Sequence, residues 1–127
     1  QNANRGKMAY LSNAKVNGAL KVTEMATGTA RFLLSNEAPK TLNGYPFDWT
    51  NLVPSTLTKG TAATKCSALI FGNFQDLYIG QWGGVDIVVD PYTGADTGEV
   101  KIVLNAWNDV KVVEPKSFAA IVDITTD

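Results

Sequence analysis

The segments TLNGYPFDWTNLVP at residues 41–54 and SALIFGNF at residues 67–74 decide the fold of this chain. In the first segment Phe47 and Trp49 alternate with polar residues, which is the period of a half-buried strand. The second segment is apolar from Ala68 to Phe71, and a glycine that follows such a strand, here Gly72, usually marks a positive φ or a close backbone approach. Together the two segments predict two strands, the second of which ends in a tight corner.

Outward from these segments, the chain has the pattern of many short strands and one helix. Strands are expected at residues 8–11, 31–34, 45–53, 67–71, 77–79, 85–89 and 100–107. Ser12 or Asn13 can cap a helix over residues 14–23, whose apolar positions partly follow helical spacing. The stretch 54–65 is rich in Thr, Ser, Gly and Ala and is expected to be a loop. Residues 117–124 are expected to form either a short helix or a last strand.

A tight hairpin is expected near the end of the chain. Asn108 and Asp109 tolerate positive φ and suit a two-residue turn, after which residues 110–113 return along the preceding strand. With this turn, Trp107 and Leu104 fall on opposite faces, so both faces carry apolar side chains. A hairpin that is apolar on both faces needs cover on both sides.

Length and composition bound the fold class. A chain of 127 residues with 45% hydrophobic residues suits one compact unit overall. The expected elements predict an α+β fold, mostly antiparallel strands with one or two helices. Eleven basic and twelve acidic residues give a net charge of -1, so the electrostatic footprint of a nucleic-acid binder is absent. No apolar run approaches the length of a membrane span, so no membrane partner is expected.

The residue types argue against an enzyme. The chain has no histidine, which excludes Ser-His-Asp and Cys-His arrangements and histidine metal sites. The single cysteine, Cys66, has no base to activate it and is expected to pack as a small residue. Asp86 and Asp90 could form a carboxylate pair, but a strand edge and a turn opener before Pro91 are favoured. We therefore assign no catalytic residue, no cofactor and no metal.

Two glycine-containing segments allow binding interpretations. The loop at residues 90–99 offers oxygen ligands that suit calcium, yet it lacks the spacing of an EF-hand, and a solvated hairpin loop is favoured. In GQWGGVD, the glycines Gly80, Gly83 and Gly84 have no following helix that could bind phosphate. These glycines are expected to permit a tight turn or a bulge.

The tryptophans leave an alternative function open. Trp49, Trp82 and Trp107 are expected to anchor the core and interfaces, as large aromatic residues usually do. The alternative is a non-catalytic, strand-rich binding module, for example one that binds carbohydrate on an aromatic platform.

A set of residues in fixed order carries a family resemblance. The set is Leu42, Gly44, Pro46, Phe71, Gly72, Phe74, Pro115 and Phe118. In their order and spacing, these residues and their surroundings resemble the C-terminal portion of the major capsid proteins of tailed bacteriophages or prophages. The resemblance covers nearly all of the chain. It implies the phage major capsid fold without the N-terminal arm, the extended loop and the spine helix that family members carry upstream.

The resemblance implies a structural function. It describes a subunit that assembles with copies of itself, as hexamers and pentamers of the full-length protein, into an icosahedral shell around double-stranded DNA. Residues 1–65 would belong largely to the axial domain, and residues 66–127 to strands shared with the peripheral domain, including the terminal hairpin. The protein would assemble in the bacterial cytoplasm and reside in the virion. Scaffold or cement proteins are further possible partners, and specific nucleic-acid binding is not expected.

Overall fold

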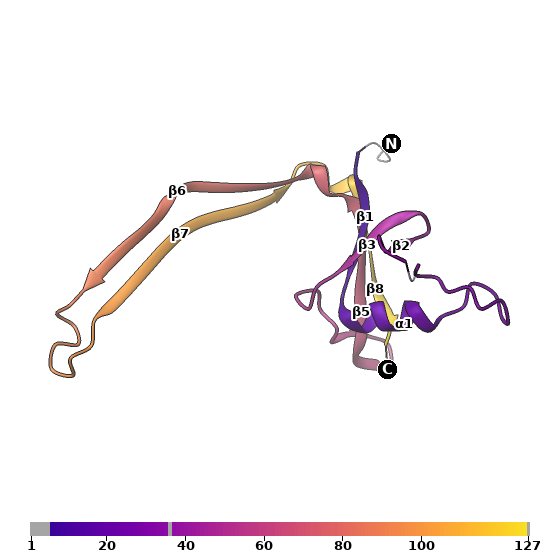
Figure 1. The fold of residues 1–127 in the computed structure, drawn as a ribbon, viewed down its shortest axis with the longest axis horizontal. Helices are drawn as coiled ribbons and strands as arrows, with labels where there is room; N and C mark the ends of the chain where they lie inside the picture. Colours follow the sequence, from indigo (N-terminus) through magenta and orange to yellow (C-terminus); the bar gives the residue numbers. More distant parts are fainter. Residues whose placement is uncertain (1–5, 36, 127) are drawn as a thin grey trace. The chain divides into compact units, whose positions relative to one another are not determined.

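The computed structural model describes residues 6–35 and 37–126. The polar residues 1–5 at the start of the chain lie outside the described residues. The chain divides into two compact units. One, which we call the sheet unit, comprises Gln1–Asp76 and Glu114–Asp127, and the other, the ribbon unit, comprises Leu77–Val113 (Figure 1). Each unit is described by itself.

Six strands form the sheet of the sheet unit. They are β1 (Met8–Ser12), β2 (Thr41–Leu42), β3 (Tyr45–Trp49), β4 (Leu57–Lys59), β5 (Ala62–Asn73) and β8 (Phe118–Thr125). The strand order is β2-β3-β1-β5-β4, and β8 pairs with β5. Only the pairing of β1 with β3 is parallel among the described strand pairs; the others are antiparallel. The α+β fold of mostly antiparallel strands is thereby confirmed.

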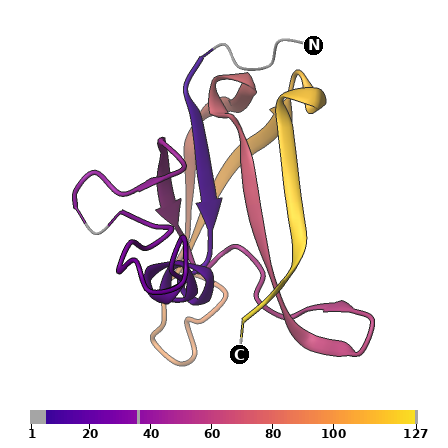
Figure 2. The same cartoon turned by 90° about the vertical axis from the view of Figure 1, so that its right-hand side faces the viewer.

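The helix α1 (Ala14–Val22) follows β1 directly and confirms the expected helix. Of the two candidate caps, Asn13 is the one used: its Oδ1 accepts from the backbone N of Val16 at 3.0 Å, and its Nδ2 donates to the carbonyl of Pro54 at 3.1 Å. Ser12 instead ends β1, and its hydroxyl donates to the carbonyl of Ala68 at 2.7 Å. Figure 2 shows α1 at the lower end of β1, where these bonds fix the start of the helix.

The core of the sheet unit joins the two segments that decide the fold. Leu42 and Phe47 come from the first segment and Leu69 from the second, and all three pack with Leu34. Their side chains are buried, and Phe47 is only 6% exposed. The alternation in the first segment therefore predicted the burial of Phe47 correctly, but Trp49, two residues further along β3, is 41% exposed.

Two expectations about the sheet unit are wrong. The stretch expected to be a loop, 54–65, contains β4 and the start of β5, which pair with each other across a turn at Gly60 (φ +58°). Threonine is common there and favours extended backbone, which outweighs its frequency in loops. The strand expected at 31–34 is not formed; Phe32 and Leu34 make only isolated bridges. The last stretch resolves as a 3-10 turn, Pro115–Ser117, followed by the strand β8.

The ribbon unit consists of two long strands, β6 (Leu77–Asp90) and β7 (Lys101–Val112), which run side by side in Figure 1. They pair antiparallel and are joined by the loop 91–100. The expected turn at Asn108 and Asp109 is wrong: both residues lie inside β7 and pair with Gln81 and Gly80. A local turn signal was overridden because β6 offers a partner along the whole of β7.

The strands expected at 77–79 and 85–89 are one strand, β6, interrupted by a bulge. Between the pairs Trp82–Trp107 and Asp86–Asn105, three residues of β6 oppose the single residue Ala106 of β7. Gly83 supplies the positive φ (+66°) that this irregularity needs. Gly83 and Gly84 thus lie in a bulge, as expected, whereas Gly80 pairs regularly with Asp109.

Candidate functional site

The described residues hold no group of three or more His, Cys, Asp or Glu side chains that could bind a metal ion. No helix in the described part of the chain is long and apolar enough to cross a membrane. Cys66 is buried, and its Sγ lies 3.7 Å from the carbonyl oxygen of Ala62. A functional site must therefore be sought among exposed surfaces and the residues singled out by the family pattern.

Asp86 and Asp90 share one face of β6, but they do not converge on a cleft. Asp86 pairs across the ribbon with Asn105 and is exposed. Asp90 accepts from the hydroxyl of Thr93 and from the backbone N of Tyr92 at 2.9 Å. These bonds lower the pKa of the Asp90 carboxyl below its ordinary value, and the bond from Thr93 contributes most. A general acid needs a raised pKa, so Asp90 acts here as the opener of the loop.

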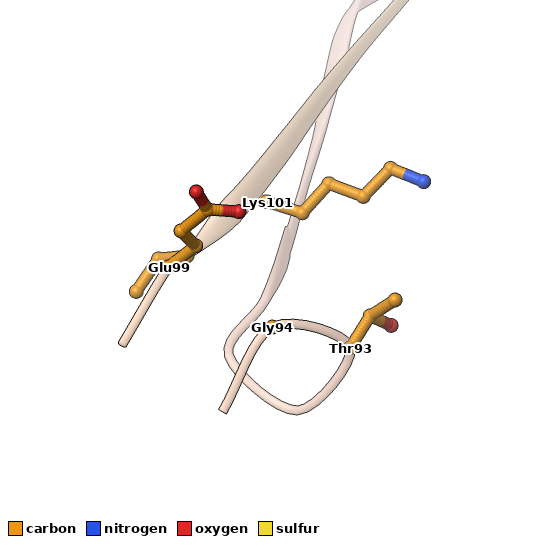
Figure 3. A pocket seen from close by; sticks show the side chains of 5 residues that line it. Thr93, Gly94, Glu99 and Lys101 are labelled. Carbon is orange, nitrogen blue, oxygen red and sulfur yellow. The ribbon is translucent and has the colours of Figure 1, made fainter. Parts of the chain in front are cut away.

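The loop that follows Asp90 encloses a small pocket of about 250 Å³ (Figure 3). Its lining includes Thr93, Gly94, Glu99 and Lys101. Figure 3 shows the charged ends of Glu99 and Lys101 pointing in different directions rather than toward one point. The carbonyl oxygen of Gly94 accepts from the backbone N of Glu99 at 2.9 Å. This bond, like those to Asp90, lies within the loop, which agrees with a hairpin loop.

The first family segment forms a turn between β2 and β3. Leu42 ends β2 in the core, and Asn43 (φ +51°) and Gly44 (φ +82°) make the reversal. Positive φ at both central residues belongs to the turn type that suits two-residue hairpins. Pro46 follows opposite Thr41, at a position where β3 does not yet pair with β1. A strand proline is tolerated at such a place because its missing N–H leaves no ladder bond unmade.

The second family segment shapes a contact with β8. Gly72 pairs with Phe118, and a Cβ atom at Gly72 would lie 2.3 Å from the Phe118 ring. Phe118 also meets Phe74 edge to face, with 5.5 Å between ring centroids. Two reasons for a glycine were expected here, a positive φ or a close approach of backbone. Gly72 has no positive φ; the close approach is present, but it is made by the Phe118 side chain. Pro115 begins the 3-10 turn that leads into Phe118.

An aromatic cluster and a groove occupy one end of the same sheet. The rings of Tyr10 and Phe71 lie 4.3 Å apart, and Tyr45 meets Phe71 edge to face at 5.2 Å. Next to them lies a groove of about 820 Å³ whose lining includes Met8 and Phe74. No sequence pattern indicated the groove, since its residues come from three separate segments.

The tryptophans differ from the expectation of core anchors. In the chain by itself, Trp107 is 58% exposed and Trp82 is 59% exposed, and Trp49 is also exposed. Trp82 and Trp107 are direct cross-strand partners. The Trp82 ring lies over Gly80, where an added Cβ would meet it at 3.2 Å. None of the three is a core anchor in the chain by itself; for Trp82 and Trp107 the reason is that the ribbon unit has only two strands, and nothing within that unit packs over them. A role as interface anchors stays a prediction.

One exposed apolar surface of the ribbon unit is a face of its two strands. Side chains alternate between the two faces of a strand. Because the bulge adds an even number of residues to β6, residues on one face before the bulge continue on the same face after it. We call this surface the apolar ribbon face. It comprises Leu77, Ile79, Gln81, Ile87 and Val89 of β6 and Ile102, Leu104, Ala106, Asn108, Val110 and Val112 of β7.

Sequence reasoning missed this face. The even-numbered residues from 102 to 112 are apolar except Asn108, which is a period-2 signal for one half-buried strand. Placing the turn at Asn108 broke that run and suggested two apolar faces. Both faces do carry apolar side chains, since Trp82 and Trp107 lie on the opposite face, but that face also carries every charged residue of the two strands.

Comparison with protein-family models gives a match to the phage capsid family over residues 1–123. No curated protein matches the chain.

Proposed function

The chain belongs to the phage capsid family, and from that premise we propose that it is the C-terminal portion of a major capsid subunit. Its role is capsid-related and structural, its family is not a family of enzymes, and its place is the virion. Beyond this, copies of the full-length protein form hexamers and pentamers that close into an icosahedral shell around double-stranded DNA, and they assemble in the cytoplasm of the bacterial host.

The observation that carries this proposal is the exposed apolar surface of the ribbon unit. Ile79, Ile87 and Leu104 are each more than half exposed in the chain by itself. Soluble monomers rarely expose large contiguous apolar patches, and such patches mark surfaces that bind another protein. A subunit that functions through association has this property, and an isolated binding domain with a covered core does not.

In such a subunit the sheet unit contributes to both domains, and the ribbon unit to one of them. We assign residues 1–65 largely to the axial domain and residues 66–127 to strands shared with the peripheral domain, with the ribbon unit as its terminal hairpin. The family positions Leu42, Gly44, Pro46, Phe71, Gly72, Phe74, Pro115 and Phe118 then have a structural role. They set the turn before β3 and the packing of β5 on β8, and they contribute no chemistry.

Mass spectrometry of purified particles tests the proposal. Virions or induced prophage particles should contain peptides from residues 1–127 in one of their most abundant proteins, at hundreds of copies per particle. A low number of copies per particle, as for a tail protein, would contradict a major capsid role. So would the absence of these peptides from particles that contain DNA. Scaffold or cement proteins, where present, would appear in the same preparation as separate abundant species.

The proposed lack of catalysis has a separate test. We expect no hydrolysis of ester, peptide or glycoside substrates by the purified chain. Any activity that co-purifies should persist in Asp86→Asn and Asp90→Asn variants, because neither carboxylate lies in a cleft with a partner. Turnover abolished by either substitution would show that the carboxylates are catalytic.

One observation favours a carbohydrate-binding module as the second candidate. Trp82 and Trp107 are exposed side by side on one face of the ribbon, opposite the apolar ribbon face. Exposed indole rings can stack on sugars as well as on proteins. Glycan binding that is lost in Trp82→Ala and in Trp107→Ala, with an unchanged melting temperature, would favour this candidate. Absence of binding to a broad glycan panel is the outcome we expect.

A further inference from the structure

The face of the ribbon that lies opposite the apolar ribbon face holds an exposed aromatic pair. We call it the tryptophan face, after Trp82 and Trp107. The two residues oppose each other across the strands, and each is more than half exposed. Opposed residues of an antiparallel pair project from the same side of the sheet. The two indoles therefore start from neighbouring positions on one surface, and the ribbon unit itself does not bury them.

The Trp82 ring lies with one face against the backbone at Gly80. A Cβ atom added at Gly80 would lie 3.2 Å from Cη2 of the ring and 3.6 Å from both Cζ2 and Cζ3. An edge-on ring would hold the two flanking atoms much farther from the added atom than the nearest one, so these distances mean that the ring turns its face toward Gly80. The other face of the indole is then directed to solvent, and it carries the negative potential of the π-system.

A carboxylate lies beside this ring. Asp109 is the residue opposite Gly80, so the ring that covers Gly80 is next to the Asp109 side chain on the same surface. The Oδ1 atom of Asp109 accepts from the backbone N of Val110 at 2.9 Å. Its Oδ2 atom has no hydrogen-bond or ion-pair partner among the described residues. An exposed π-face and a free carboxylate oxygen thus adjoin each other.

The charges around the tryptophan pair favour a cation. Along the face, the nearest charged positions on the two sides of the pair are Asp109 and Asp86, and both are exposed. The nearest cation is Lys111, which follows Asp109 on the same face of β7. In the part of the chain that the structure describes, no ion pair joins Lys111 to either carboxylate. A positively charged group would therefore meet complementary charge at the pair, and an anion would not.

Arginine fits this arrangement better than lysine does. A guanidinium is planar, so it can stack on an indole while the N–H groups at its edge donate to a carboxylate beside the ring. The ammonium of lysine is a compact, strongly hydrated point charge and lacks this flat surface. The combination of the Trp82 face and the Asp109 carboxylate supplies both contacts that a guanidinium can use at the same time.

We propose that the tryptophan face binds an arginine side chain of a partner polypeptide, with the guanidinium stacked on Trp82 and hydrogen bonded to Asp109. Asp86 adds attraction from the other side of the aromatic pair. The inference is drawn from the ribbon unit alone and does not depend on the capsid proposal. It also differs from sugar binding, because the charge of the ligand is essential here.

An NMR titration of the 127-residue chain with a capped Gly-Val-Arg-Val-Gly peptide is the first test. We expect a saturable shift of the Trp82 indole N–H resonance, assigned with Trp82→Phe, at millimolar peptide, because one exposed stacked ion pair is weak. The same peptide with citrulline in place of arginine keeps the shape without the charge and should bind at least fivefold more weakly. Equal binding of the two peptides, or no saturable shift with the arginine peptide, would overturn the proposal.

Two carboxylates of the tryptophan face provide matched variants. Asp109→Asn and Asp90→Asn each remove one charge from this face without changing the size of the side chain. Asp109→Asn should weaken binding of the arginine peptide at least threefold. Asp90→Asn should leave the affinity unchanged, since Asp90 lies at the far end of β6 and exposed charges are screened beyond about 10 Å at 0.1 M salt. Equal losses in the two variants would contradict a contact with Asp109 and overturn the proposal.

Salt and sugars separate this proposal from the carbohydrate-binding alternative. Raising the salt concentration should weaken binding of the arginine peptide, because the charges are exposed. A panel of oligosaccharides should leave the Trp82 resonance in place. A Trp82 shift that is produced by an oligosaccharide and not by the arginine peptide would overturn the proposal in favour of a sugar platform. None of these outcomes bears on the capsid proposal, which is judged by particle composition.

Discussion

The sheet unit and the ribbon unit are built from similar residues and use them in opposite ways. In the sheet unit, Phe47 is 6% exposed and Leu34 is 1% exposed, and both pack in a core closed by strands from distant segments. In the ribbon unit, Leu104 is 64% exposed and Trp107 is 58% exposed. The same apolar content therefore stabilises the fold in one unit and remains available for association in the other. Burial depends on what covers a strand, and two strands cannot cover themselves.

The largest effect we expect contrasts one aromatic residue from each unit. Phe47→Ala should destabilise the sheet unit by about 4 kcal/mol, since it removes a buried ring and leaves a cavity. Trp107→Ala should change the free energy of unfolding by less than about 1 kcal/mol, in the range of ordinary surface substitutions. Urea denaturation, followed by far-UV circular dichroism, measures both. A Trp107→Ala loss as large as that of Phe47→Ala would show that the ribbon is buried against a partner or within the chain.

The contrast also explains which parts of the fold the sequence could predict. The helix, its cap at Asn13 and the burial of Phe47 follow from spacing within a few residues, so local patterns found them. The turn at Asn108 and Asp109 was a local signal too, but the pairing of β7 with β6 overrode it. The exposure of Trp107 could not be predicted, because sequence spacing says that a face is apolar and not whether anything covers it.

The candidate site was predictable to a smaller extent. The family positions were found in the sequence, yet the reason for Gly72 was visible only once Phe118 was seen packed against it from a strand 46 positions later. That contact joins the second segment to the last strand, and no local pattern encodes it. The apolar ribbon face was encoded by alternation in β7, and the misplaced turn concealed it.

The second prediction compares two glycines, one from each unit. Gly72→Val should destabilise the sheet unit by roughly 2–3 kcal/mol, because the new side chain overlaps the Phe118 ring and forces it to move. Gly84→Val is the matched control: it lies in the ribbon, has ordinary φ, and has open space around its Cβ position. Thermal unfolding should show a lower Tm for Gly72→Val and little change for Gly84→Val. Equal melting temperatures for Gly72→Val and the unaltered chain would show that Phe118 moves away freely.

A smaller effect is expected at the helix cap, and it tests whether the sheet unit depends on local bonds as well as on its core. Asn13→Ala should cost about 1–2 kcal/mol, since it removes the acceptor for Val16 N and the donor to the Pro54 carbonyl at a buried position. Asn13→Ser keeps an acceptor for the helix and should recover part of that loss. Denaturant midpoints of the two variants provide the measurement. An Asn13→Ala variant as stable as the unaltered chain would mean that the core alone holds α1 in place.

The smallest effect concerns pH, and it is confined to the loop of the ribbon unit. The hydroxyl of Thr93 and the backbone N–H of Tyr92 hydrogen bond the Asp90 carboxylate and lower its pKa. A carboxyl with a lowered pKa in the folded state stabilises the loop above its unfolded pKa of about 3.9. That contribution is lost as pH falls through the lower, folded value. We expect an NMR titration of the Asp90 carboxyl carbon to give a pKa below that of a model peptide, and Thr93→Val to move it back toward the ordinary value. Because Asp90 is exposed, the midpoint of global unfolding should scarcely respond to either change. An Asp90 pKa at or above the ordinary value would show that the loop is open in solution, and the ribbon unit would then lack order at its tip as well as cover along its face.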